Sequence, residues 1–158
     1  MGRVVRRRRI AAPAGALWRV IADPHHLPRW WPRTQRVENV TGDEPVGMTW
    51  TQVLGTKEGR GIRADYECIE ADPERRYVYE QEIDQTPFER FLKSSRTEID
   101  LEPDGDGTKV SLANVQRLRG LSRFGSPVMR RGIGRSLAEA LTGLERAATG
   151  ALDDGDAD

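Results

Sequence analysis

Apolar and polar residues alternate from Gln35 to Leu118, and this period of two residues is typical of strands with one buried face. Turn sequences rich in glycine, aspartate and proline interrupt the alternation at residues 42–45, 55–59, 72–73, 84–87 and 104–107. Such short connections favour antiparallel neighbours, because a parallel crossover needs a much longer segment. We therefore predict six strands in an antiparallel meander.

The apolar spacing changes to three and four residues between Ser126 and Ala148, which predicts a long helix. Ser126-Pro127 is a typical start, since serine can accept a hydrogen bond from a free backbone N–H and proline has no N–H to lose. Gly150 is a typical stop. The apolar face carries Met129, Ile133, Leu137, Ala140, Leu141, Leu144 and Ala148. The polar face carries Arg131, Arg135, Glu139, Thr142, Glu145 and Arg146. We expect the apolar face to lie against the sheet.

The segment before the meander predicts one more strand, at Val4–Ile10, and a short helix between Pro13 and Pro24. Between Pro28 and Pro32 the chain has room for one helical turn at most. Trp30 and Trp31 lie in that turn, where they either form one wall of a pocket or fill the core. The sequence supports both interpretations equally.

The inner face of the predicted sheet mixes apolar and polar side chains. It comprises Met48, Trp50, Gln52, Leu54, Ile62, Ala64, Tyr66, Cys68, Tyr77, Tyr79, Gln81, Ile83, Phe91, Lys93, Ser95, Thr97, Ile99, Leu101, Val110, Leu112, Asn114, Gln116 and Leu118. The outer, solvated face carries Arg63, Asp65, Glu67, Glu80, Glu82, Arg96, Glu98 and Asp100. A fully packed core has little use for so many inward polar groups, which indicates a cavity holding water or a ligand. The alternative is that β-bulges shift the register or that these groups lie at the wet ends of the sheet.

Composition narrows the choice of partners and location. The 158 residues hold 25 lysines and arginines and 25 aspartates and glutamates, so no overall field attracts nucleic acid. Five arginines between Arg3 and Arg9 fit a solvated edge strand, and we predict no nucleic-acid binding. Cys68 is the single cysteine, which fits a reducing cytoplasm. Pro13 interrupts the apolar run Ile10–Trp18, so we predict neither a signal peptide nor stable membrane insertion.

Few residues carry recognisable chemistry. His25 and His26 are adjacent and point apart, so they are poorly placed to share a metal ion, and we predict no metal and no cofactor. Tyr66, Tyr79 and Lys93 are the titratable residues on the inner face and therefore the candidates for catalysis. Lys93 follows the turn at 84–87 closely, so we expect its charged end to reach the rim and solvent rather than the interior.

Several local motifs occur in a familiar order along the chain. They are Ile10-Ala11-Ala12-Pro13, Leu17-Trp18, Asp23-Pro24, the tryptophans before Pro32, Asp72-Pro73-Glu74-Arg75-Arg76 and Gly107-Thr108-Lys109-Val110. With the meander and the long last helix, residues 3–149 resemble the polyketide cyclase/dehydrase group of the START-related, birch-pollen-allergen-like (SRPBCC) superfamily. The resemblance implies an α+β helix-grip fold: a curved antiparallel sheet wraps a long C-terminal helix, and two short helices follow the first strand. We expect one domain at 3–149 and a disordered acidic tail at 150–158.

This scaffold serves several functions, so the resemblance leaves three classes open. We favour a binding or carrier protein for a small hydrophobic or aromatic molecule, lipid-like or polyketide-like, in an internal cavity. The alternatives are an enzyme of the cyclase/aromatase type and a protein interaction module. The expected ligand contacts are Trp30, Trp31, Met48, Trp50, Gln52, Tyr66, Tyr79, Gln81, Ser95, Thr97, Leu112, Asn114, Gln116, Met129, Ile133 and Leu137. Neither the ligand nor the oligomeric state follows from the sequence.

Overall fold

The computed structural model describes the backbone of residues 2–56, 59, 61–120 and 127–156, with side chains through residue 150. The predicted helix start Ser126 and part of the predicted turn at 55–59 lie outside these residues. None of the described helices is both long enough and apolar enough to span a membrane.

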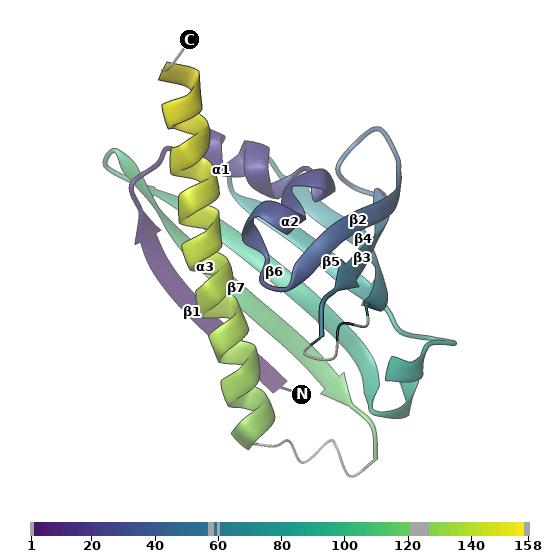
Figure 1. Cartoon of the computed structure of the whole chain (residues 1–158). Coiled ribbons are helices and arrows are strands. Elements are labelled where there is room, and N and C mark those ends of the chain that lie inside the picture. The colour runs from purple at the N-terminus through teal and green to yellow at the C-terminus, as the bar shows by residue number, and fades with distance from the viewer. Residues whose placement is uncertain (1, 57–58, 60, 121–126, 157–158) are drawn as a thin grey trace.

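The strands form one antiparallel sheet, as the alternating pattern predicts (Figure 1). They are β1 (Gly2–Ile10), β2 (Thr34–Thr41), β3 (Thr49–Leu54), β4 (Ile62–Asp72), β5 (Arg76–Glu82), β6 (Leu92–Asp104) and β7 (Gly107–Leu118). Their order across the sheet is β1-β7-β6-β5-β4-β3-β2. The six-stranded meander is therefore confirmed, and β1 adds to its free edge by pairing with β7. The tight hairpin between β6 and β7 uses Gly105, whose φ of 63° suits a residue without a Cβ.

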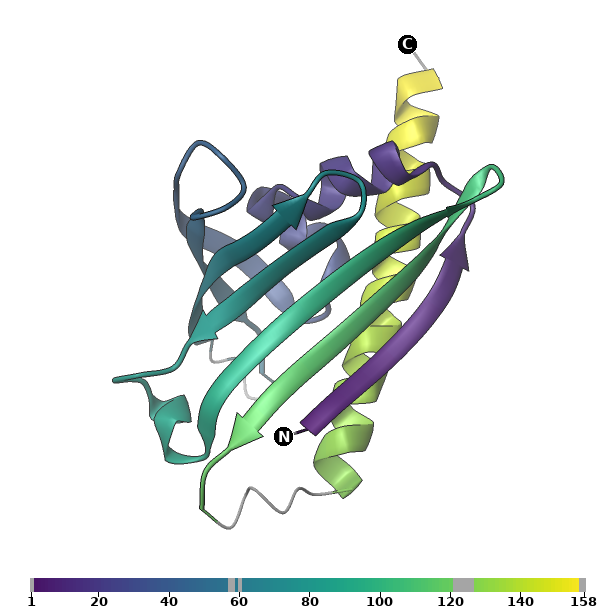
Figure 2. The ribbon, with the colours of Figure 1, turned by 180° about the vertical axis from the view of Figure 1, so that it is seen from behind.

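The α-helices lie on one side of the sheet, and short 3₁₀ turns occur in the connections. They are α1 (Ala14–Ile21), the 3₁₀ turn η1 (Pro24–His26), α2 (Leu27–Trp30), a second 3₁₀ turn η2 (Pro87–Arg90) and α3 (Pro127–Asp156). In Figure 1, α3 crosses the sheet over β1 and β7, with α1 and α2 beside it. Figure 2 shows the opposite, outer face, where no helix covers β1, β7 and β6.

The inward face of α3 is the predicted one. Its central residues Leu137, Ala140, Leu141, Leu144 and Ala148 are all buried. The predicted C-terminus was wrong, however, because the helix continues through residue 150 to Asp156. Residues 150–156 thus form the last turns of the helix instead of a disordered tail. Ala and Leu at 151 and 152 are strong helix formers, which favours this continuation.

A close approach joins α2 to α3. A Cβ built on Gly143 of α3 would lie 2.3 Å from the carbonyl oxygen of Trp30 in α2. No side chain fits in that space, so Gly143 lets the two backbones touch. The contact holds Trp30 against the long helix, and only 3 % of that tryptophan is exposed.

Most of the predicted inner face is buried, but three positions are corrections. Lys93 is exposed because the pairing of β6 with β7 shifts between Leu92 and Ser94, which leaves Lys93 in a β-bulge. Ile62 and Phe91 are 44 % and 41 % exposed. Ile62 begins β4 and Phe91 precedes β6, so both lie at the ends of strands.

Candidate functional site

A groove with a volume of about 440 Å³ lies between α3 and β7, and the segment that links α2 to β2 also lines it. Its lining comprises Trp31, Arg33, Asn114, Gln116, Met129, Gly132, Ile133, Arg135, Ser136, Leu137 and Glu139. Six of the predicted ligand contacts are brought together here. They are Trp31, Asn114, Gln116, Met129, Ile133 and Leu137.

The apolar wall of the groove follows from helix geometry. Met129, Ile133 and Leu137 recur every four residues, which places them one above another along α3. Trp31 completes the wall from the end of α2. Its ring is held edge-on by Trp30, with ring centroids 5.3 Å apart, and by Tyr79, at 6.3 Å. The position of Trp31 is therefore fixed by aromatic packing on two sides.

The opposite wall is polar and belongs to β7. Alternation along the strand turns Asn114 and Gln116 to the inner face. The side-chain Nδ2 of Asn114 donates a long hydrogen bond of 3.4 Å to Ser95 Oγ on β6. Asn114 Oδ1 is buried and has no hydrogen-bond partner among the described residues. A buried acceptor without a partner is costly, so this oxygen favours a donor in the groove.

Charged side chains mark the rim of the groove. Arg33 precedes β2, and Arg135 and Glu139 project from α3; all three are exposed. The backbone carbonyl of Arg33 accepts a hydrogen bond of 2.7 Å from the N–H of Gly55, which fixes this segment on the sheet edge. The helical periodicity assigned Arg135 and Glu139 to the polar side of α3. Their place at the rim depends on how much of the helix β7 covers, which periodicity does not reveal.

The other predicted contacts lie outside this groove. They are Trp30, Met48, Trp50, Gln52, Tyr66, Tyr79, Gln81, Ser95, Thr97 and Leu112. Many of them pack against one another instead: Trp50 stacks on Tyr66 with centroids 6.0 Å apart, and Tyr79 packs edge-on against both rings at 5.5 Å. Gln52 accepts a hydrogen bond from Trp50 Nε1 at 3.3 Å and donates to Thr34 Oγ1 at 3.1 Å. This inward amide therefore has protein partners and does not require a ligand.

The catalytic candidates do not form an acid–base pair at the groove. Burial raises the pKa of Tyr66 to about 12, and the Asp65 carboxylate acts in the same direction. Burial also raises the pKa of Tyr79, and its neighbour Tyr66 adds to that effect. Both phenols therefore remain protonated near neutral pH, where they can donate hydrogen bonds but are poor bases. Lys93 is exposed in its bulge, away from both tyrosines.

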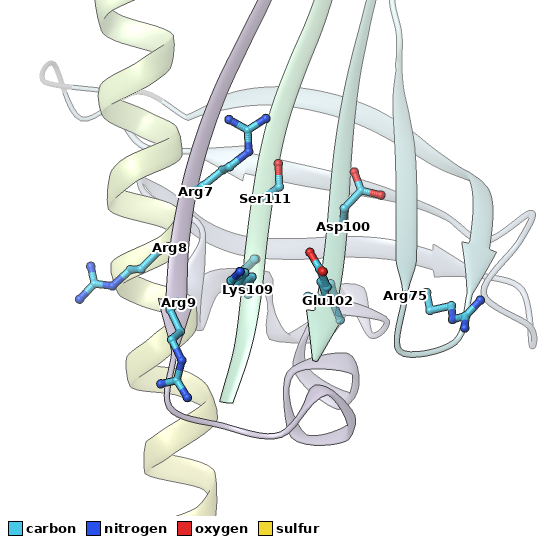
Figure 3. Close-up of a pocket in the computed structure, with 10 residues that line it drawn as sticks. Arg7, Arg8, Arg9, Arg75, Asp100, Glu102, Lys109 and Ser111 are labelled. Carbon is cyan, nitrogen blue, oxygen red and sulfur yellow. The ribbon is translucent and has the colours of Figure 1, made fainter. Parts of the chain in front are cut away.

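A second pocket, of about 430 Å³, lies on the outer face over β1, β7 and β6 (Figure 3). Its labelled side chains carry both signs of charge, with Arg7, Lys109, Asp100 and Glu102 among them. Asp100 accepts two hydrogen bonds, of 2.9 and 3.0 Å, from Arg76 on β5. Interspersed and partly paired charges are typical of a solvated sheet face. We therefore take the inner groove as the candidate functional site.

The histidines fold into a local turn. Asp23 accepts hydrogen bonds from the backbone N–H of His25 at 3.0 Å and from its Nδ1 at 2.8 Å. The His26 Nδ1 lies 3.1 Å from the carbonyl oxygen of Arg19. Within the described part of the chain, no three histidine, cysteine or carboxylate side chains are grouped to hold a metal ion.

Comparison with known proteins gives both a family and a fold. Residues 1–149 match the family model described as "Polyketide cyclase / dehydrase and lipid transport". The crystal structure of TTHA0849 from Thermus thermophilus is 21% identical, with a TM-score of 0.75 over 95% of this chain and 99% of that chain. A START superfamily protein from Mycobacterium smegmatis is 13% identical, with a TM-score of 0.74 over 94% of this chain and 98% of that chain.

A third structure is a di-domain protein. It is the ARO/CYC StfQ from the steffimycin biosynthetic pathway, 15% identical, with a TM-score of 0.71 over 99% of this chain and 53% of that chain. These similarities show a shared fold, and they confirm the predicted helix-grip arrangement. No curated protein matches the chain.

Proposed function

Because this chain belongs to the polyketide cyclase/dehydrase and lipid-transport family, we propose that it binds a small hydrophobic or aromatic molecule in the groove between α3 and β7. The observation that carries the proposal is that an apolar wall faces polar side chains of β7 across the groove, and that one of these, Asn114, has a buried Oδ1 without a partner among the described residues. An apolar wall with a few converging polar groups is the usual composition of a small-molecule site. The groove volume, about 440 Å³, lies within the range of such sites.

Binding explains the groove better than catalysis does. Cyclisation or dehydration needs a positioned acid and base beside the reacting carbon. Tyr66 and Tyr79 do not line the groove, and Lys93 is exposed in its β-bulge and does not line it either. The residues that do line it supply apolar contacts, amides and rim charges, which suit recognition and orientation of a ligand.

An interaction module acting through the arginine-rich β1 is less well supported. Arg8 donates hydrogen bonds to Thr142 Oγ1 and Glu145 Oε1 of α3, both at 3.1 Å. Arg9 forms ion pairs with Asp104 at 2.9 Å and Asp106 at 3.0 Å. These two arginines therefore hold the edge strand to the helix and to the β6–β7 turn.

Titration with the uncharged aromatic probe N-phenyl-1-naphthylamine tests the proposal. We expect saturable binding with a rise in probe fluorescence, and we expect Ile133→Trp to weaken it by about tenfold or more. The new indole would occupy the groove and displace apolar contacts worth at least about 1.4 kcal/mol. The matched control is Val128→Trp, which adds the same side chain at a position that is 77 % exposed on the same helix and does not line the groove.

Thermal denaturation of both variants shows whether the fold is retained. Equal probe affinity for the wild type and a folded Ile133→Trp variant would place the binding site elsewhere and overturn the proposal.

We further propose a cytoplasmic location, supported by the single cysteine, Cys68, which is a buried free thiol.

A further inference from the structure

We infer that the preferred occupant of the groove is a hydrophobic monoanion, with its apolar body against Trp31, Ile133 and Leu137 and its acidic group at Arg33 and Arg135. This inference rests on the proposed function, because it specifies the chemistry of the molecule that the same groove binds. It narrows the proposed ligands from hydrophobic molecules in general to those that carry one negative charge. Carboxylic acids with an aromatic or aliphatic body belong to this class.

The two arginines reach the groove from different parts of the chain. Arg33 comes from the segment between α2 and β2, two residues after Trp31, and Arg135 comes from α3, two residues after Ile133. Both arginines nevertheless line the same groove as the apolar wall. A ligand that packs on this wall therefore shares the groove with two cationic side chains.

Both guanidinium groups are available to a ligand. Neither Arg33 nor Arg135 makes an ion pair or side-chain hydrogen bond to any residue that the structure describes. Arg8 and Arg9, by contrast, are engaged by Glu145, Asp104 and Asp106. Guanidinium groups present several N–H donors in one plane, which match the two oxygens of a carboxylate.

The charge balance at the rim favours a single negative charge. Among the described residues, Glu139 is the only carboxylate that lines the groove, where it faces the same space as the two arginines. Glu139 follows Arg135 by one helical turn, yet no ion pair joins them. The described lining thus holds two positive charges and one negative charge, which leaves a net charge of +1 that a carboxylate or sulfonate neutralises. A phosphate monoester with two charges would lose more hydration against the apolar wall of the groove, which makes its binding more costly.

A pair of fluorescent probes that differ in one acidic group tests the inference. They are 8-anilinonaphthalene-1-sulfonate and the uncharged N-phenyl-1-naphthylamine, which share the same aromatic body. We expect the sulfonate to bind the wild-type protein more tightly. Raising the salt concentration to about 1 M should weaken sulfonate binding and leave the neutral probe unaffected, since salt screens exposed charges.

Variants of the rim then separate charge from shape. Arg33→Gln and Arg135→Gln should each weaken sulfonate binding by about two- to fivefold and together by about five- to twentyfold, as expected for partly solvated ion pairs. Glu139→Gln should strengthen sulfonate binding, because it removes the opposing charge. The neutral probe should bind all these variants equally. Arg131→Gln is the matched control, since Arg131 is exposed on the same helix and does not line the groove.

The outcomes distinguish the inference from the function on which it rests. If both probes bind, with equal affinity and without response to the rim variants, the inference fails and the proposed function stands. If neither probe binds, both fail. Weaker sulfonate binding in Arg131→Gln, equal to that in Arg135→Gln, would also overturn the inference, because it would show a general effect of helix charge.

Discussion

Glu98 lies on the outer face of β6, yet its side chain is only 5 % exposed because three arginines converge on it. Arg3 and Arg96 approach its carboxylate oxygens to 2.9 Å, and Arg76 approaches to 3.7 Å. The alternation along β6 correctly predicted that Glu98 points away from the core. It did not predict the burial, because the arginines come from β1, β5 and β6 and meet only when the sheet forms.

The pH dependence of stability should reveal this contact. Burial by itself raises the pKa of Glu98, but the hydrogen bond from Arg3 and the attraction of Arg96 and Arg76 outweigh it and hold the pKa below its ordinary value. A carboxylate with a lowered pKa stabilises the fold above the pKa of the unfolded chain, about 4.3. That contribution is lost as pH falls through the lower pKa of the folded state.

We therefore predict that Glu98→Gln lowers the free energy of unfolding at pH 7 by about 1.5–3 kcal/mol, the range for a hydrogen bond to a charged group. The difference from the wild type should shrink as the pH falls below about 4. Urea denaturation at several pH values measures both effects. Glu102→Gln is the control, since Glu102 is exposed on the same strand. An equal loss in both variants would mean that the arginines around Glu98 add nothing to stability.

At the scale of the element, we expect alanine substitutions at two glycines of α3 to change the stability in opposite directions. Gly143 touches the backbone of Trp30, whereas a Cβ on Gly132 would meet no atom within 4 Å. Alanine is the better helix former by about 1 kcal/mol, so a glycine-to-alanine change helps wherever there is space. The difference between these positions therefore measures how closely α2 approaches α3.

We expect Gly132→Ala to stabilise the protein by about 0.5–1 kcal/mol. Gly143→Ala should destabilise it by about 1–3 kcal/mol, because the methyl group would force the helices apart. Chemical denaturation of the two variants, measured side by side, is the test. Stabilisation of similar size in both would show that Trp30 lies farther from α3 than in this structure.

The strand β6 illustrates where an element departs from its sequence pattern. Alternation predicted Lys93 and Ser95 on the same inner face, but the bulge between Leu92 and Ser94 shifts the register. Ser95 is buried beneath Asn114, and Lys93 is exposed. The alternation along a single strand does not reveal where a β-bulge lies, because the pairing of β6 with β7 sets its position.

At the scale of the whole molecule, the distribution of metal ligands gives a further prediction. The described residues contain no group of three metal-binding side chains, and the ring Nδ1 of His25 is hydrogen-bonded to Asp23. We expect elemental analysis of purified protein to find no stoichiometric transition metal, and the melting temperature to remain the same in chelator. One zinc or iron per chain would contradict this.

Periodicity and turn chemistry were sufficient to predict the seven strands, the meander and the inward face of α3. These features depend on neighbours in sequence, since side chains alternate along a strand and recur every three or four residues on a helix. Five groove residues could likewise be predicted, because Asn114, Gln116 and the apolar face of α3 follow these two periods. Trp31 does not follow from either period. The expectation that residues 3–149 form one domain stays a prediction.

The tertiary structure alone decided which inward residues form a groove and which fill the core. Trp50, Tyr66 and Tyr79 follow the same alternation as Asn114, yet they pack on one another because β3, β4 and β5 bring their rings together. Arg33 and Arg135 reach the groove only because the link to β2 and α3 meet at β7. A periodic pattern fixes the direction of each side chain. Whether that side chain then meets a neighbour or open space depends on where the helices lie across the sheet.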